Sequence, residues 1–223
     1  MVDFKKLMSE EYKEEYKRKK QEREEQERIE EEIINQSCHF TGHRPNNKHM
    51  FGYDLKHPSY KPIIEKTTEV IEMVITREGI TRFCSGGAIG FDTISFWCVH
   101  KLKEKYSHIK NIVAVPFKNQ PIKWNENDKK WYRKMLELAD GVIYVDELEE
   151  YKVKDVPIGE YHVAKMSQRN KFMVNTTKIT IAFSDGSKGG TANCLYDANK
   201  TGRIIIRIDP RYNYELDIRY GIR

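Results

Sequence analysis

Three glycine-containing segments carry residue types that bind anions, and the first is FTGHRP at residues 40–45. In this segment Gly42 is followed by an imidazole, His43, and a guanidinium, Arg44. A guanidinium binds phosphate well because it donates two parallel hydrogen bonds to the phosphate oxygens. The structural alternative is an ion pair for Arg44 and a hydrogen-bonded turn for His43. We favour ligand contacts for Thr41, Gly42, His43 and Arg44.

The second segment, SGGAIGFD at residues 85–92, is rich in small residues. Small residues let backbone N–H groups approach an anion closely where a helix begins. The segment lacks the Lys-Ser/Thr pair of a P-loop and does not match GxGxxG, so the alternative is a tight turn between a strand and a helix. Asp92 either orients a ligand hydroxyl or caps that helix. The expected ligand contacts are Ser85, Gly86, Gly87, Gly90 and Asp92.

The third segment, DGSKGGT at residues 185–191, is another glycine-rich turn that opens onto a helix. It follows MSQRNKFM at residues 166–173, a helical pattern whose methionines point to the core. Arg169, on the polar side of that pattern, is either an ordinary surface residue or part of the cleft formed by the glycine turn. We expect ligand contacts from Arg169, Asn170, Asp185, Gly189, Gly190 and Thr191.

Alternating strand and helix patterns from residue 37 onward position these segments and are typical of a sheet with crossover helices. Ligands bind such sheets at the carboxyl ends of the strands, so function is expected in the loops after strands one, two, four and five. The predicted fold is a Rossmann-like, doubly wound, mainly parallel α/β sheet with helices on both faces. The predicted strands are Cys38–Thr41, Arg82–Ser85, Ile112–Pro116, Val142–Asp146, Ile179–Ser184 and Ile204–Ile208, and the predicted helices are Tyr60–Arg77, Phe91–Tyr106, Glu126–Ala139, Gly159–Val174 and Thr191–Asn199.

The N-terminal segment differs from the rest of the chain. Residues 4–34 contain no Gly or Pro and are dominated by Glu, Lys, Arg and Gln, which favour a long helix. Because Lys17–Arg28 has no hydrophobic seam, a continuous coiled coil is not expected there. The chain is therefore divided into a charged N-terminal helix, residues 1–35, and a nucleotide-ligand-binding domain, residues 36–223.

Composition limits the class of protein. Of 223 residues 39% are hydrophobic, enough for one good core, and residues 1–34 carry a net charge of −3, which leaves +8 on the remainder. A basic domain favours anionic partners, although a merely soluble basic surface is an equal alternative. The four cysteines form no CxxC pair, the seven histidines are scattered, and no apolar run is long enough to cross a bilayer. We expect a cytoplasmic protein with reduced thiols, no membrane contact and no resident cofactor, with Mg²⁺ bound at most through ligand phosphates.

The motifs FTGHRP, SGGAIGFD, MSQRNKFM and DGSKGGT, in this order, resemble the SLOG superfamily and in particular its YpsA-like branch. The resemblance spans about residues 37–209 and leaves the N-terminal helix outside. It implies a Rossmann-like domain whose members bind nucleotides, nucleotide-derived signals or single-stranded DNA, while LOG enzymes hydrolyse nucleoside monophosphates to base and ribose phosphate. Because one fold hosts all of these activities, the fold alone does not choose among them.

The LOG catalytic pattern is only partly present. LOG enzymes carry Arg-Lys-x-x-Met on a helix, then Pro-Gly-Gly-x-Gly-Thr and a catalytic glutamate. Arg169 and Met173 match the first motif and residues 189–191 loosely match the second, but no carboxylate follows Thr191 until Asp197. Cleavage of an N-glycosidic bond needs a carboxylate to stabilise charge or activate water. The resemblance therefore implies ligand binding without the catalytic acid.

Three hypotheses follow, and the first is non-catalytic sensing or sequestration of a nucleotide or nucleotide-derived signalling molecule. The second is a LOG-like nucleoside-monophosphate N-glycosidase or related hydrolase, in which Asp92, Asp146 or Asp185 replaces the missing acid. The third is single-stranded nucleic-acid binding of the DprA kind, favoured by the +8 balance and by tryptophans available for stacking or, alternatively, for packing. Related domains often pair, so we also expect a homo-oligomer. The tryptophans are Trp97, Trp124 and Trp131.

Overall fold

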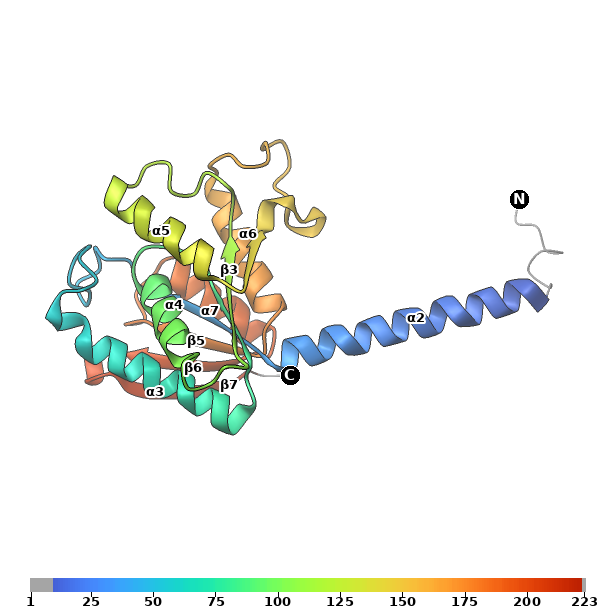
Figure 1. Cartoon of the computed structure of the whole chain (residues 1–223), viewed down its shortest axis with the longest axis horizontal. Helices are drawn as coiled ribbons and strands as arrows, with labels where there is room; N and C mark the ends of the chain where they lie inside the picture. The colour runs from blue at the N-terminus through green and yellow to red at the C-terminus, as the bar shows by residue number, and fades with distance from the viewer. Residues whose placement is uncertain (1–9, 222–223) are drawn as a thin grey trace.

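The computed structural model describes residues 10–221 and has an α/β architecture around one seven-stranded sheet (Figure 1). The strand order is β4-β3-β2-β1-β5-β6-β7, and every neighbouring pair is parallel except β6 and β7, which are antiparallel. The predicted doubly wound, Rossmann-like fold is confirmed. The strands are β1 (Ser37–Gly42), β2 (Arg82–Ser85), β3 (Lys110–Val115), β4 (Gly141–Tyr144), β5 (Ile179–Phe183), β6 (Ile204–Asp209) and β7 (Glu215–Tyr220).

Helices cover both faces of the sheet, and two neighbouring residues of β2 show which helices lie on which face. Phe83 belongs to the core under α3 and α4, while its neighbour Cys84 packs against Met173 of α6. Successive side chains of a strand point to opposite faces, so α6 lies across the sheet from α3 and α4. Helix α5 packs with α4, and helix α7 packs with α6. The helices are α2 (Glu10–Asn35), α3 (Lys61–Glu78), α4 (Phe91–Leu102), α5 (Glu126–Leu138), α6 (Val163–Asn175) and α7 (Gly190–Lys200), with 3₁₀ turns η1 (Pro58–Tyr60), η2 (Val145–Glu147), η3 (Glu149–Tyr151) and η4 (Pro210–Tyr212).

The chain reverses its direction of winding beside β1. It runs outward from β1 through β2 and β3 to β4, then returns through α6 to form β5 on the other side of β1. The carboxyl ends of β1, β2 and β5 therefore lie side by side at one edge of the sheet. This reversal is the topological switch at which doubly wound sheets bind ligands.

The structure differs from the predicted elements at several boundaries. The helix predicted from Gly159 begins at Val163, where the side chain of His162 accepts a hydrogen bond from the N–H of Ala164 and caps the helix. The helix predicted to reach Tyr106 ends at Leu102. The strand predicted to include Asp146 ends at Tyr144, and Asp146 lies in η2.

The seventh strand, β7, was not predicted from the sequence. Its residues, ELDIRY, alternate charged and apolar types, and Ile218 and Tyr220 remain exposed at the edge of the sheet. An exposed antiparallel edge strand lacks the continuous apolar run of a buried parallel strand, so the pattern that identified the other strands was absent.

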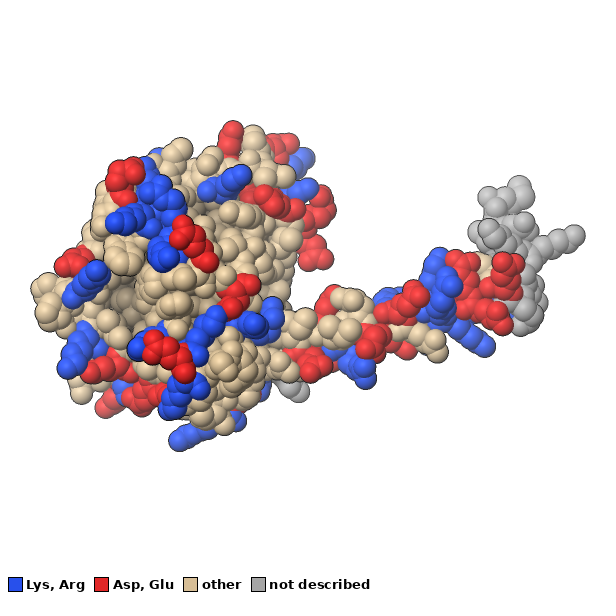
Figure 2. Space-filling model, viewed as in Figure 1, with Lys and Arg blue, Asp and Glu red and all other residues tan. Residues whose placement is uncertain are grey.

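Helix α2 extends away from the body of the molecule and carries mixed charges along its length (Figures 1 and 2). Every residue from 11 to 33 is exposed, and i,i+4 ion pairs along the described part of the helix stabilise it, among them Lys19 with Glu15 at 2.7 Å. The predicted long helix is confirmed from residue 10, and residues 4–9 of that prediction lie outside the described residues. Over residues 10–221, no helix is long and apolar enough to span a membrane.

Candidate functional site

The three glycine-containing segments meet at the carboxyl edge of the sheet, because β1 lies between β2 and β5. The segment after β1 contacts the segment after β2 directly: a Cβ on Gly90 would lie 2.6 Å from the carbonyl oxygen of His43 and 3.1 Å from Cα of Arg44. Gly90 also has a φ of +113°, a backbone conformation that residues with a side chain rarely adopt. Glycine is therefore required at this position.

Arg169 reaches from α6 to the turn after β2. Its Nη1 lies 3.3 Å from Oδ2 of Asp92, and both side chains are buried. A Cβ on Gly86 would lie 1.1 Å from the same Nη1, so the guanidinium occupies the space that any larger residue would fill. The backbone N–H of Ala88 also donates to Asp92, at 3.4 Å. We call Arg44, Gly86, Asp92 and Arg169 the arginine cluster.

The arginine cluster has more positive than negative charge. Burial lowers the pKa of Arg44, the charge of Asp92 acts in the opposite direction, and the charge of Arg169 lowers it further. Arg44 is nevertheless an exposed residue, so solvent and a ligand can reach it. The cluster thus contains two guanidinium groups and one carboxylate, which pairs with Arg169. An anion beside them would restore the balance of charge.

Two buried polar atoms at this site have no hydrogen-bond partner among the described residues: Nε of Arg169 and the hydroxyl oxygen of Ser85. Buried polar atoms are nearly always hydrogen-bonded, so each of these two atoms lacks a partner that a water molecule or a ligand would supply. Ser85 is the last residue of β2 and directly precedes Gly86. The predicted contacts Ser85, Gly86, Asp92 and Arg169 therefore lie together.

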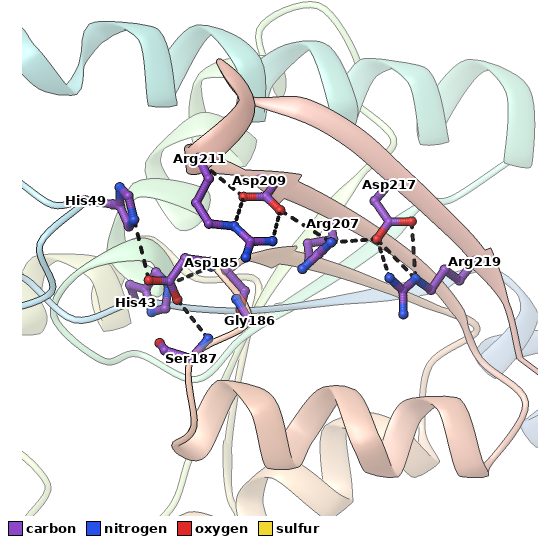
Figure 3. A network of polar contacts seen from close by, with 11 residues as sticks. His43, His49, Asp185, Gly186, Ser187, Arg207, Asp209, Arg211, Asp217 and Arg219 are labelled. Atoms are coloured by element: carbon purple, nitrogen blue, oxygen red, sulfur yellow. Dashed lines mark hydrogen bonds and ion pairs between the residues drawn. The ribbon is translucent and has the colours of Figure 1, made fainter.

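The turn after β5 is joined to the segment after β1 through His43 (Figure 3). The backbone N–H of Asp185 donates to Nε2 of His43 at 3.0 Å, and that nitrogen also lies 3.0 Å from Oδ1 of Asp185. One nitrogen cannot accept from the amide and donate to the carboxylate together. Because burial lowers the pKa of His43, we assign a neutral ring that accepts from the amide.

Asp185 holds the turn in place with its carboxylate. Burial acts to raise its pKa, but hydrogen bonds from the side chain and the backbone of Ser187 outweigh burial, and the pKa is lowered to about 2. The N–H of Ser187 donates to Oδ1 at 2.9 Å, and Nε2 of His49 lies 3.5 Å from Oδ2. The carboxylate predicted to contact a ligand is thus also the group that shapes the loop.

Gly189 and Gly190 form the open part of the site. Gly189 is the N-cap of α7 and makes no side-chain capping bond, and a Cβ on Gly189 or Gly190 would meet no atom within 4 Å. The first N–H groups of a helix have no partner within the helix and carry its positive dipole. The start of α7 therefore offers exposed donors to an anion.

Helix α7 packs against β1, the strand beside the arginine cluster. Burial raises the pKa of Cys194, which is four residues after Gly190, to about 12, while a hydrogen bond from the side chain of Thr41 and the charge of Arg169 lower it. The two glycine turns, one after β2 and one after β5, thus flank the end of β1. The first leads into α4 and the second into α7. Thr191 and Asn170 are half-buried, and among the described residues no hydrogen bond or ion pair joins either of them to the cluster.

Two of the predicted glycines have packing reasons of their own. A Cβ on Gly42 would lie 2.6 Å from the side chain of Phe91, and a Cβ on Gly87 would lie 3.1 Å from side-chain atoms of Tyr132 and Val113. Both glycines are needed for close packing whether or not a ligand is bound. Their presence in the motifs alone does not indicate ligand contact.

The prediction missed Gln120 and Tyr132, which support the turn after β2. The hydroxyl of Tyr132 donates to Oε1 of Gln120 at 3.0 Å, and Nε2 of Gln120 donates to the carbonyl oxygen of Gly86 at 3.3 Å. Both side chains are buried. Gln120 sits in a loop rich in polar residues, so only its burial, which the sequence did not show, distinguishes it.

Arginines of β6 and η4 were also missed (Figure 3). A Cβ on Gly186 would lie 3.6 Å from Nη1 of Arg207 and 4.0 Å from Nη1 of Arg211. Both arginines pair with Asp209, at 3.3 and 2.7 Å, and Arg207 also pairs with Asp217 at 2.8 Å. Arg207 lies within the sixth predicted strand and Arg211 in the turn after it, and neither segment was considered as part of the site.

The three carboxylates considered as replacements for a catalytic acid all form ion pairs or hydrogen bonds within the protein. Asp92 pairs with Arg169, and Asp185 bonds to Ser187. Asp146 lies 2.8 Å from Nζ of Lys165 and accepts the N–H of Gly159 at 2.7 Å. Within residues 10–221, no group of three or more His, Cys, Asp or Glu side chains is arranged to hold a metal ion.

Comparison with known families decides where the chain belongs. The model of the YpsA proteins, described as the YspA SLOG family, matches residues 38–204. The chain belongs to the SLOG family. The matched region contains the whole arginine cluster and both glycine turns, whereas helix α2 lies before it. The resemblance of the sequence motifs to the YpsA-like branch is thereby confirmed.

Individual relatives agree with this assignment. The chain is 46% identical over 170 residues to the uncharacterized SPbeta prophage-derived protein YoqJ of Bacillus subtilis, an alignment that covers 75% of this SLOG chain and 99% of YoqJ. It is 24% identical over 160 residues to a UPF0398 protein of Halalkalibacterium halodurans, covering 72% of the chain and 78% of the relative. A UPF0398 protein of Bacillus pumilus is 26% identical over 153 residues, covering 68% and 74%.

Proposed function

We propose that this SLOG protein binds a nucleotide or nucleotide-derived signalling molecule without turning it over. The phosphate is held at the carboxyl edge of the sheet by Arg169, Arg44 and the N–H groups of the two glycine turns. The observation that supports this best is the buried guanidinium of Arg169, whose Nε has no partner among the described residues and which pairs with Asp92, the single carboxylate of the arginine cluster. A buried, incompletely bonded cation favours an anionic ligand.

Turnover is not expected, because the carboxylates near the site are already paired with other groups of the protein. A glycosidase needs a carboxylate at the scissile bond that is available to stabilise charge or to activate water. Asp92, the carboxylate in the arginine cluster, instead pairs with Arg169 and accepts the N–H of Ala88. We therefore assign Asp92 the role of orienting Arg169, with Mg²⁺ entering only through the phosphates of the ligand.

We also propose that the protein is located in the cytoplasm and forms a homo-oligomer. Support for the cytoplasm comes from the four cysteines, which are buried free thiols, as expected in a reducing compartment. The homo-oligomer is supported by the fact that related domains often pair. Size-exclusion chromatography with light scattering measures the assembly directly, and a monomer at working concentration would contradict it.

Native mass spectrometry of the protein purified directly from cells tests the proposed function. We expect a bound small molecule whose mass and fragments identify a nucleotide or a derivative of one. Incubation of the protein with common nucleoside monophosphates should release no free base above the background rate. Release of base would assign the protein to the hydrolases, and binding that is limited to oligonucleotides and falls steeply with salt would assign it to nucleic-acid binding.

A further inference from the structure

A second possible binding site lies outside the arginine cluster. A cavity of about 890 Å³ is enclosed by α3, α4, α5 and residues 53–56, and Figure 2 shows it as a recess on the visible face. All three tryptophans of the sequence line it: Trp97, Trp124 and Trp131. None of the residues predicted to contact the nucleotide is among its lining residues. We call it the tryptophan cavity.

The aromatic walls of the tryptophan cavity are held in fixed orientations. Trp97 and Trp131 form an edge-to-face pair with ring centroids 5.9 Å apart, and Trp124 packs against Tyr132 at 5.1 Å with the rings 76° apart. Edge-to-face pairs fix the orientation of each ring. Trp131 nevertheless keeps 39% of its surface exposed, which is a large fraction for a side chain of this kind. The walls are therefore preformed and only partly covered.

The charges around the tryptophan cavity are balanced. Two acidic residues, Asp54 and Asp128, and two basic residues, Lys56 and Lys101, line it. Nζ of Lys56 lies 4.6 Å from the ring centroid of Trp131. The cavity thus lacks the excess of positive charge found in the arginine cluster. Its chemistry selects a ring system through stacking and burial and does not select a phosphate.

We infer that the tryptophan cavity binds a small molecule with a planar aromatic ring system, at a site separate from the proposed phosphate site. The volume lies within the range of about 300–1,000 Å³ that is typical of small-molecule sites. Tryptophan side chains bind planar rings by stacking, whatever the substituents of the ring. The ring belongs either to a free heterocycle or to an uncharged nucleoside, and these two share the same recognition chemistry.

The site is best tested with Trp131, which does not support the turn after β2. Tyr132 is unsuitable because its hydroxyl is linked through Gln120 to the carbonyl of Gly86. Trp131→Ala removes a stacking wall, and Trp131→Phe keeps a smaller aromatic one. Tyr220→Ala, at an exposed position of β7, is the matched control because it removes an aromatic side chain elsewhere.

The measurement is the NMR spectrum of the three tryptophan indole N–H groups during titration with adenosine, benzimidazole or cyclohexanol. We expect saturable shifts with the two aromatic probes and little response to cyclohexanol. Loss of stacking on one ring should weaken binding in Trp131→Ala by about 5-fold to 140-fold, while Trp131→Phe and Tyr220→Ala change it less than about threefold.

The result distinguishes this inference from the proposed function, because neither aromatic probe carries a phosphate. Gly190→Asp, which would weaken binding of a phosphate, should leave the response to adenosine unchanged. The inference is overturned by the absence of saturable shifts with both aromatic probes, by an equal response to cyclohexanol, or by unchanged affinity in Trp131→Ala. Indole signals that change with protein concentration alone would also overturn it, because a second copy of the chain would then cover the cavity.

Discussion

At the scale of single residues, Gly86 and Arg169 depend on each other. Gly86→Ala places a methyl group 1.1 Å from the present position of Nη1 of Arg169, so the guanidinium must move and its contact with Asp92 is lost. Disrupting a buried ion pair costs up to about 3–5 kcal/mol, and we expect a loss of stability in that range by urea denaturation. Gly190→Ala, in open space, should change stability by less than about 0.5 kcal/mol. Equal stability of the two variants would contradict the described packing.

Arg169→Ala is a less informative test of ligand binding. It removes the ligand's expected partner, but it also leaves the buried carboxylate of Asp92 without its cation. An unpaired buried charge destabilises the fold, so lost binding would be confounded with partial unfolding. Gly190 is the better position, because an added side chain there meets no atom within 4 Å.

His39 should give the protein a measurable dependence of stability on pH. Burial lowers its pKa to about 3, with smaller contributions from Arg203 and Arg169. In the unfolded chain a histidine binds a proton below about pH 6.5, so between pH 6.5 and 3 the unfolded state binds more protons. Stability therefore falls as pH falls through this window, by up to about 1.4 kcal/mol per pH unit from this residue.

Urea denaturation at several pH values measures that slope. His39→Gln should flatten it, even though the variant also loses the contact between Nδ1 and the hydroxyl of Thr177 at 2.6 Å. His108→Gln, at an exposed position, is the matched control and should keep the slope of the unaltered protein. A slope that survives in His39→Gln would show that other groups carry the effect.

At the scale of the elements, α2 should be separable from the sheet. Its described residues up to 33 are exposed, and its contact with the body is made at its end, where the hydroxyl of Ser37 donates to the carbonyl oxygen of Ile33. Removal of residues 1–31 should lower the helix signal in circular dichroism but shift Tm by less than about 3 °C, since surface ion pairs contribute little. A larger fall in Tm would mean that the removed segment packs against the body.

The sequence predicted the elements that follow simple periodic patterns and missed those that do not. β5 is buried at all five positions, and four of its five residues are apolar, as expected of a buried parallel strand. β7 was missed because its edge position allows charged residues. The start of α6 was misplaced by four residues because its cap is His162, which is not among the usual capping residues.

At the scale of the whole molecule, the sequence placed the glycine turns correctly but could not show how distant segments meet. The contact of Arg169 with Gly86 joins residues more than eighty positions apart, and it depends on the return of the chain through α6. The tryptophan cavity likewise arises from three helices that share one face of the sheet. Tertiary packing creates both features, and local patterns do not contain them.

The central claim is that a phosphate binds between the arginine cluster and the start of α7. Calorimetry with adenosine monophosphate, comparing Gly190→Ala with Gly190→Asp, tests it most directly, because the two variants differ only in a carboxylate at an open position. We predict that Gly190→Ala binds within about threefold of the unaltered protein and that Gly190→Asp binds at least about tenfold more weakly, a difference of about 1.4 kcal/mol. Equal affinity of the two variants, or no binding to the unaltered protein, would contradict the claim.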